Sequence, residues 1–198
     1  AMSTTSVEGA RRNMEAEVPA WNFAEVTRTA HDEWNSYLSR IDVTGTDTDK
    51  QNYYTAFYHA LIQPNQIADV DGKYRNADNK VVCASNGEFY STFSCWDTYR
   101  AAHPFYTMVI PERVDGLVNS LVEQAEVQGF LPIWGLWGKE NFCMIGLLAH
   151  ELRGRARVQR HQAHTDREPR REVRLGDIHE VRLLAYRPRS FRVGFQLA

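Results

Sequence analysis

Two long segments carry apolar side chains at the 3.6-residue spacing of an α-helix, and this periodicity restricts the chain to a largely helical fold. In residues 22–41 the apolar face consists of Phe23, Val26, Ala30, Trp34, Leu38 and Ile41. In residues 111–129 it consists of Val114, Leu117, Val118, Leu121, Val122 and Ala125. Pro111 suits the first turn of the second helix and Gly129 suits its end, because glycine accepts the left-handed conformation that often closes a helix.

Start and stop signals predict three further helices. Thr5 and Glu8 fit a capping box that begins a helix ending before Pro19. Residues 50–62 form a second candidate, and a third is expected to carry the aromatic segment before Pro111. Five helical segments joined alternately by short and long loops suit an array of α/α hairpins, either a bundle or a toroid of helix pairs.

The segment between the third and fourth predicted helices has a different composition. Residues 64–92 are rich in Asp, Asn and Gly and contain two short β-like runs, which predicts a small β-hairpin insertion near residues 72–93. Asp69 and Asp71 fall short of the calcium-loop pattern, so a plain turn is the better interpretation. Long ordered loops between helices often carry function.

Composition excludes some functional classes. The chain has 198 residues and a net charge of −2, which favours neither nucleic acid nor an anionic membrane surface. It has no run of about 18 apolar residues that would indicate a membrane span. Cys83, Cys95 and Cys143 are not at metal or redox spacing, so we expect small core side chains.

The composition changes abruptly after Gly146. Residues 147–198 hold 12 of the 19 arginines, six acidic residues and no lysine, without helical or strand periodicity. A basic tail for nucleic acid and a solvated arginine-rich helix face are two interpretations. The third, which we favour, is translation in a shifted reading frame, because out-of-frame GC-rich DNA encodes much arginine and little lysine.

The segment "YSTFSCWDTYRAAHPFYTMVIPERV" mixes flat aromatic rings with charged hydrogen-bonding groups. Trp96 offers a flat surface for a pyranose ring, Asp97 can accept from sugar hydroxyls, and Arg100 can donate in a fork. The alternative is that Asp97 and Arg100 pair with each other beside aromatic packing. His103 precedes a proline and is expected to be structural.

Two more groups of candidates lie in the loop "FLPIWGLWGKENFCMIG". Glu140 and Asn141 are suited to lining a pocket. Alternatively, they start a helix whose dipole favours an acidic residue there. Trp134 and Trp137 belong either to the core or to a pocket wall, and the residues alone leave that choice open.

Four segments together resemble glycoside hydrolase family 92, the calcium-dependent exo-α-mannosidases. In chain order they are "SVEGARRNMEAEVPAWNF", "YYTAFYHALIQPNQIADVDGKYR", "FYSTFSCWDTYRAAHPFYTMVIPERV" and "GFLPIWGLWGKENFCMIG". The resemblance implies linker helices over residues 1–46 and part of an (α/α)6 catalytic toroid over 47–146. It also implies that residues 147–198 depart from the family, which supports a shifted frame, and that the β-sandwich of the family is missing.

The resemblance implies an inverting hydrolysis of terminal α-linked mannose, with α-1,2 linkages as the expected substrate and calcium as the cofactor. Trp96, Asp97, Arg100, Glu140 and Asn141 would contribute to the mannose pocket. No catalytic acid, catalytic base or metal ligand carries over, so the chain alone is expected to be inactive.

Several expectations concern partners and location. Mannose-containing glycans are the expected ligands, and neither nucleic acid nor a membrane is expected as a partner. The alternative function is a stand-alone helical interaction module that self-associates through apolar faces which missing hairpins would otherwise cover. The N-terminus shows no export signal, whereas relatives in the resembled family are commonly exported by bacteria. The sequence therefore does not predict the cellular compartment of the protein.

Overall fold

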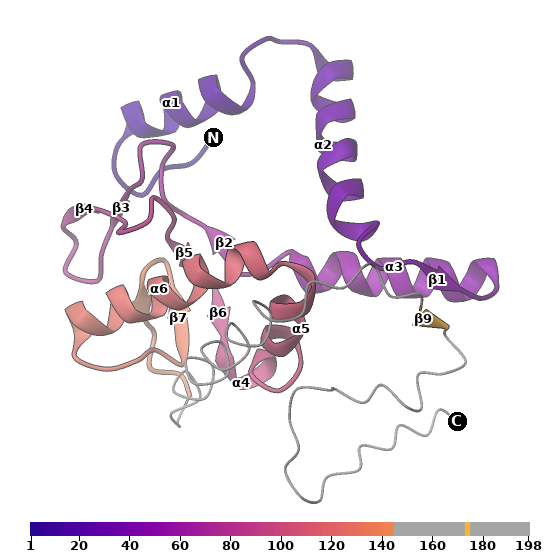
Figure 1. Cartoon of the computed structure of the whole chain (residues 1–198). Helices are drawn as coiled ribbons and strands as arrows, with labels where there is room; N and C mark the ends of the chain where they lie inside the picture. The colour runs from indigo at the N-terminus through magenta and orange to yellow at the C-terminus, as the bar shows by residue number, and fades with distance from the viewer. Residues whose placement is uncertain (145–172, 175–198) are drawn as a thin grey trace, which may run out of the picture.

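A computed structural model describes residues 1–144 and 173–174 of the chain (Figure 1). Six α-helices lie in this part of the chain and account for most of its regular structure, as the sequence predicted. They are α1 (Val7–Glu17), α2 (Phe23–Leu38), α3 (Asp47–Leu61), α4 (Cys95–Thr98), α5 (Ala102–Val109) and α6 (Pro111–Gln128).

Short strands connect these helices. The predicted hairpin is present as antiparallel β3 (Lys73–Arg75) and β4 (Val81–Cys83), and β2 (Asn65–Gln66) pairs with β5 (Tyr90–Ser91) at the ends of the same insertion. A three-stranded sheet joins β6 (Phe93–Ser94), β7 (Trp134–Leu136) and β8 (Lys139–Glu140). Parallel β1 (Val43–Thr44) and β9 (Val173–Arg174) form one further pair.

Two helix starts differ from the sequence prediction. Ser6, not Thr5, caps α1, and its hydroxyl accepts from the Gly9 N–H at 3.0 Å. The third helix begins at Asp47 rather than at residue 50, because Thr46 and Asp49 form a capping box that starts it earlier. By contrast, α6 has Pro111 in its first turn and ends at a left-handed Gly129, as predicted.

The prediction of a single helix for the aromatic segment before Pro111 is wrong. This segment forms β5 and β6, then the single-turn α4, and only then α5. The two strands form because each has a partner distant in sequence: β5 pairs with β2, and β6 pairs with β7. Non-local pairing therefore overrides the local helical tendency here.

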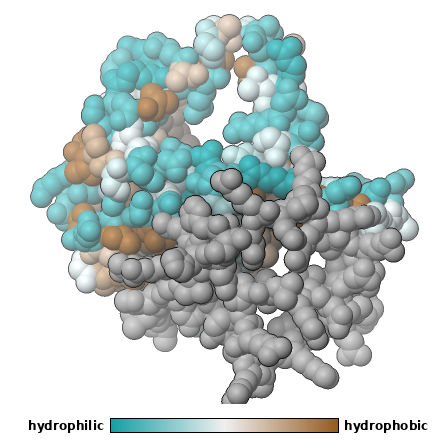
Figure 2. All heavy atoms as spheres, viewed as in Figure 1, coloured by the Kyte–Doolittle hydropathy of each residue, from teal (hydrophilic) through white to brown (hydrophobic). Residues whose placement is uncertain are grey.

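Helix α2 is amphipathic as predicted, but its apolar face is largely uncovered among the described residues. None of its residues is buried, and the Phe23 side chain is 86% exposed. Figure 1 shows α1 beside the β3–β4 insertion and α2 standing away from the body, with α2 meeting α3 at its C-terminal end. In the view of Figure 2 the outer surface of these two helices is mainly hydrophilic, with isolated hydrophobic residues.

The core lies where α5 and α6 pack against β5 and β6. Its buried members are Tyr90, Phe93, Cys95, Tyr106, Val114, Leu117, Leu121 and Leu131. A smaller cluster fixes the β3–β4 hairpin, where the rings of Tyr74 and Phe89 stack with their centroids 3.7 Å apart. Of the three cysteines only Cys95 belongs to the core. Cys83 and Cys143 are exposed, so the prediction was wrong for these two, which lie in a hairpin strand and a loop.

A polar clip, formed by Asp69 with Ser3, Thr5 and Asn13, ties the N-terminal segment to the insertion. The Asp69 side chain is 1% exposed, and its Oδ2 accepts from the Ser3 hydroxyl at 2.8 Å and the Thr5 hydroxyl at 2.5 Å. Its Oδ1 accepts from the Asn13 amide at 2.9 Å. The Asp69 carbonyl accepts from the Gly72 N–H at 2.7 Å, which confirms the predicted turn.

None of the described helices is long and apolar enough to cross a membrane.

Candidate functional site

Helix α4 presents the first group of predicted site residues at the surface. The strand before it, β6, pairs with β7, and the Cys95 N–H donates to the Ile133 carbonyl at 3.0 Å, which anchors the helix start. Trp96 and Asp97 project from this buried anchor, and the Trp96 side chain is 45% exposed. A flat indole surface and a carboxylate are thus both exposed on this single helical turn.

Asp97 and Arg100 do not form an ion pair within the described part of the chain. The Asp97 carboxylate accepts a hydrogen bond from the Ser94 hydroxyl. The Arg100 guanidinium lies 5.1 Å from the centroid of the Tyr99 ring, and its Nε donates to the Tyr99 hydroxyl. The structure therefore differs from the alternative in which these two charges satisfy each other, and both groups keep atoms that a ligand can reach.

Glu140 is a buried structural carboxylate in this arrangement. Its side chain is 6% exposed, and Oε2 accepts from the backbone N–H groups of Ile133 at 2.5 Å and Trp134 at 2.9 Å. Oε1 accepts from the N–H groups of Asn141 and Phe142, both at 3.0 Å. Four backbone donors thus converge on one carboxylate. Glu140 therefore holds the loop in place, and it does not begin a helix as the alternative interpretation expected.

Asn141 lies at the surface directly after β8. Its side-chain Oδ1 accepts from the Cys143 N–H at 3.0 Å, and its own N–H donates to the Trp134 carbonyl at 3.2 Å. The amide is thereby oriented while the residue stays exposed. Asn141 is the member of this pair that a ligand can contact directly.

The three-stranded sheet brings the two predicted groups together. Ser94, at the end of β6, pairs with Trp134, and Glu140, at the end of β8, pairs with Gly135 next to it. The α4 turn and the Glu140–Asn141 segment consequently leave the same end of the sheet, from the two strands that flank β7. The sequence placed both groups in one pocket only through the family resemblance. The strand pairing supplies a physical reason for their proximity.

His103 and the two tryptophans have distinct environments. The His103 ring packs edge-on against Tyr106 with centroids 5.4 Å apart, and its Nε2 is buried without a hydrogen-bond partner among the described residues. Burial lowers the pKa of His103 to about 4, so the ring is neutral near pH 7, as expected of a structural histidine. Trp137 is exposed, whereas the Nε1 atom of Trp134 is buried.

The carboxylates of the insertion do not fit a calcium ion. The Asp69 oxygens are taken up by the clip, and Asp71 pairs with Arg12 at 3.2 Å and Lys73 at 2.8 Å. Within residues 1–144, moreover, the structure contains no group of three His, Cys, Asp or Glu side chains that could hold a metal ion.

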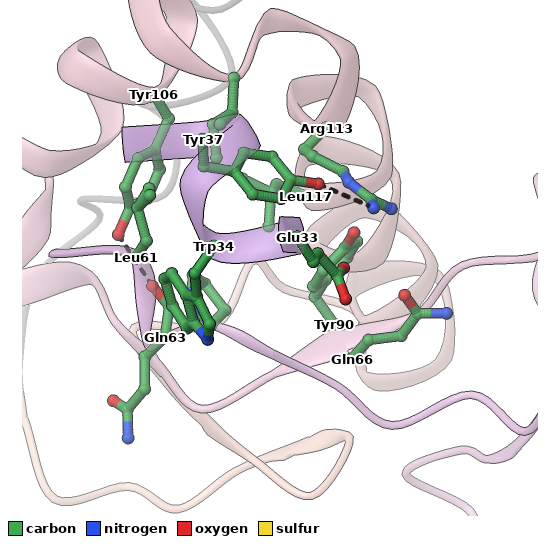
Figure 3. Close-up of a pocket in the computed structure, with 12 residues that line it drawn as sticks. Glu33, Trp34, Tyr37, Leu61, Gln63, Gln66, Tyr90, Tyr106, Arg113 and Leu117 are labelled. Carbon is green, nitrogen blue, oxygen red and sulfur yellow. Dashed lines mark hydrogen bonds between the residues drawn. The ribbon is translucent and has the colours of Figure 1, made fainter. Parts of the chain in front are cut away.

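A cavity of about 380 Å³ lies apart from these residues, between α2, α6 and the chain around Pro64 (Figure 3). Sequence reasoning missed it entirely. Its lining includes Glu33, Tyr37, Gln66 and Arg113, which are far apart along the chain. No local pattern marks such residues, so only the folded arrangement reveals them.

Comparison with known proteins defines the family. The model of the glycosyl hydrolase family 92 catalytic domain matches residues 9–165. The chain belongs to glycoside hydrolase family 92. This match extends past Gly146. The predicted departure of residues 147–198 from the family concerns residues outside the described part of the chain, apart from residues 173–174. No curated protein sequence matches the chain significantly.

Solved family 92 structures share the fold. A family GH92 α-mannosidase from Bacteroides thetaiotaomicron is 35% identical with a TM-score of 0.72, over 76% of this chain and 20% of that enzyme. The same figures hold for that enzyme in complex with mannoimidazole. An inverting family GH92 mannosidase from the same bacterium is 28% identical with a TM-score of 0.63, over 76% of this chain and 21% of that chain.

This family 92 chain therefore spans about a fifth of the length of the enzymes that it matches. Its mainly helical fold, predicted as part of an (α/α)6 toroid, agrees with that placement.

Proposed function

We propose that the chain is part of an exo-α-mannosidase that hydrolyses terminal α-1,2-linked mannose with inversion and with the help of calcium. The observation that carries the proposal is the family 92 match over residues 9–165. It is supported by the similar enzyme solved with mannoimidazole and by the similar enzyme described as inverting.

In this proposal the surface around α4 forms one wall of the mannose pocket. Trp96 packs against a pyranose face, Asp97 accepts from sugar hydroxyls, and Arg100 donates to them after leaving the Tyr99 ring. Asn141 adds an oriented amide from the adjacent strand end. Glu140 contributes indirectly, because its four backbone contacts hold the loop that carries Asn141.

Inverting hydrolysis requires a carboxylic acid that protonates the leaving oxygen and a carboxylate that activates water, about 6.5–9.5 Å apart. We assign neither role, nor any calcium ligand, to the described residues. Calcium would bind the sugar through ligands supplied by other parts of the enzyme. The 198-residue chain alone is accordingly expected to be inactive.

Two measurements test the proposal. The purified chain is mixed with α-1,2-mannobiose, with calcium and with a chelator, and no mannose should be released in either case. An enzyme that contains this chain together with the remaining family 92 parts should release β-mannose first, as followed by proton NMR. An α-anomeric first product would contradict the inverting assignment, and calcium-dependent release by the chain alone would contradict its inactivity.

A second candidate function is a helical interaction module that self-associates. The observation in its favour is the exposure of Trp21 and Phe23, at 88% and 86%. Light scattering across a wide range of protein concentration would show a mass that rises with concentration. A constant monomer mass would argue against this function.

A further inference from the structure

The cavity beside α2 is bordered by five parts of the chain that are already fixed by the fold. The last turns of α2, the end of α3 with the following Gln63–Gln66 segment, β5, α5 and α6 each contribute side chains. Its volume of about 380 Å³ lies in the range of small-molecule sites, which is roughly 300–1,000 Å³. None of the residues Trp96, Asp97, Arg100, Glu140 or Asn141 lines it.

Aromatic rings held by their own hydroxyl groups form much of the wall. The Tyr106 hydroxyl donates to the backbone carbonyls of Ala60 at 2.6 Å and Gln63 at 2.8 Å. The Tyr37 hydroxyl accepts from Arg113 at 3.2 Å. Figure 3 shows the contact of Tyr106 with Gln63 and that of Tyr37 with Arg113. In this view the Trp34 indole lies below the two tyrosine rings. Because the rings are anchored, they present fixed apolar surfaces.

Three polar side chains at the rim have no partner within the part of the chain that the structure describes. Glu33, Gln63 and Gln66 line the cavity, and their side chains make no hydrogen bond or ion pair within the described residues. Together they offer carboxylate and amide oxygens as acceptors and two amide groups as donors.

The cation at the cavity is already neutralised. Arg113 donates to the Glu88 carboxylate at 2.7 Å, and this pair is partly buried. The cavity therefore does not present an uncompensated guanidinium that would select an anion. A neutral ligand with several hydroxyl groups satisfies the unpartnered carboxylate and amides, and it can place an apolar face on the Trp34 ring.

We propose that this cavity is a second sugar site, which binds a single neutral pyranose ring with Trp34 as its platform and Glu33 and Gln66 as hydroxyl partners. The site goes beyond the proposed hydrolysis, since it neither contacts nor requires the α4 surface. An aromatic wall beside a carboxylate also suits an organic cation. The two amides favour hydroxyl groups, so the cation serves as the competing outcome of the test.

The test follows the indole resonances of the 198-residue chain, labelled with nitrogen-15 at tryptophan, while methyl α-D-mannopyranoside is added. A Trp34→Phe variant identifies the Trp34 resonance, and Trp96→Phe identifies that of Trp96. We expect the chemical shift of the Trp34 indole to change with increasing glycoside concentration until it reaches a plateau. Glu33→Ala should weaken this binding about tenfold, the equivalent of losing one hydrogen bond to a charged group.

A matched control separates a local effect from a change in net charge. Asp32→Ala removes the neighbouring exposed carboxylate of α2, which pairs with His31 and does not line the cavity. This variant should bind the glycoside as the parent chain does. Both positions are exposed on a helix, where alanine is well tolerated, and circular dichroism confirms that each variant is folded.

Each contrary result overturns the inference in a distinguishable way. Movement of the Trp96 resonance alone would assign the sugar to the α4 surface, which supports the proposed function and removes the second site. No movement of Trp34, or equal weakening by Glu33→Ala and Asp32→Ala, would also remove it. Tighter binding of choline than of the glycoside would make the cavity an organic-cation site instead.

Discussion

Replacing Glu140 by glutamine tests how far one carboxylate holds the loop that carries Asn141. Each carboxylate oxygen of Glu140 accepts from two backbone N–H groups, at 2.5 and 2.9 Å for Oε2 and at 3.0 Å twice for Oε1. The amide of glutamine keeps one oxygen and turns the other into an NH₂ group. In either orientation of the glutamine side chain, the NH₂ group faces two backbone N–H donors and cannot accept a hydrogen bond from them.

The expected cost follows from these lost contacts. Hydrogen bonds to a charged group contribute about 1.5–3 kcal/mol each, and the two remaining bonds lose their charge. Glu140→Gln should therefore lower the free energy of unfolding by about 3–5 kcal/mol. This is a large part of the 5–15 kcal/mol that is typical of a folded domain, on the order of a third.

Urea unfolding followed by circular dichroism measures the change. Glu126→Gln makes the same chemical substitution at an exposed position of α6 and should change stability by less than about 0.5 kcal/mol. A loss below about 1 kcal/mol for Glu140→Gln would refute the reasoning, because the four N–H groups would then find other acceptors, such as water. Equal losses in the two variants would refute it as well.

Three other predictions concern different parts of the chain. Asp69→Ala leaves the donors of the clip unpaired and should lower the free energy of unfolding by about 3 kcal/mol in a urea titration. Asp71→Ala breaks only exposed contacts with Arg12 and Lys73 and should lower it clearly less in the same titration. Since burial depresses the pKa of His103 to about 4, below its unfolded value near 6.5, protonation favours unfolding as the pH falls through this window. Stability should drop by about 2 kcal/mol more between pH 7.5 and pH 5 in the parent chain than in His103→Phe, and parallel pH profiles would contradict this. Translation of the coding DNA for residues 146–198 in all three frames should reveal an open frame that resumes an apolar helix, and its absence would establish the arginine-rich tail as genuine.

Helices with complete local signals were predictable from sequence. The α6 helix has an apolar stripe, Pro111 at its start and Gly129 at its end, and the structure agrees at each point. The amphipathic pattern of α2 was predicted equally well, but such a pattern does not indicate which residues cover the apolar face of the helix. The single helix predicted for the aromatic segment before Pro111 was wrong because β6 pairs with residues 134–135, about forty positions later, and no local pattern encodes such a partner.

The sequence named the candidate site residues but did not indicate their environments in the fold. Trp96, Asp97 and Arg100 are at the surface as a ligand-binding interpretation requires. Glu140 is buried on four backbone donors, which a sequence cannot indicate because those donors belong to a turn that exists only after folding. The second sugar site draws its lining from segments between residues 33 and 117, so its detection depended on the three-dimensional structure.

The clip at Asp69 constrains the order in which the chain assembles. Its side-chain links join residues 56 to 66 positions apart, and Arg75 adds a link of 71 positions to Thr4. Contacts of such long sequence separation form late, since the intervening chain must first lose its freedom. Helix α1, although it is synthesised before the insertion, therefore docks only once the insertion has folded. Protection of its amide protons in pulsed hydrogen exchange would mark the completion of the insertion.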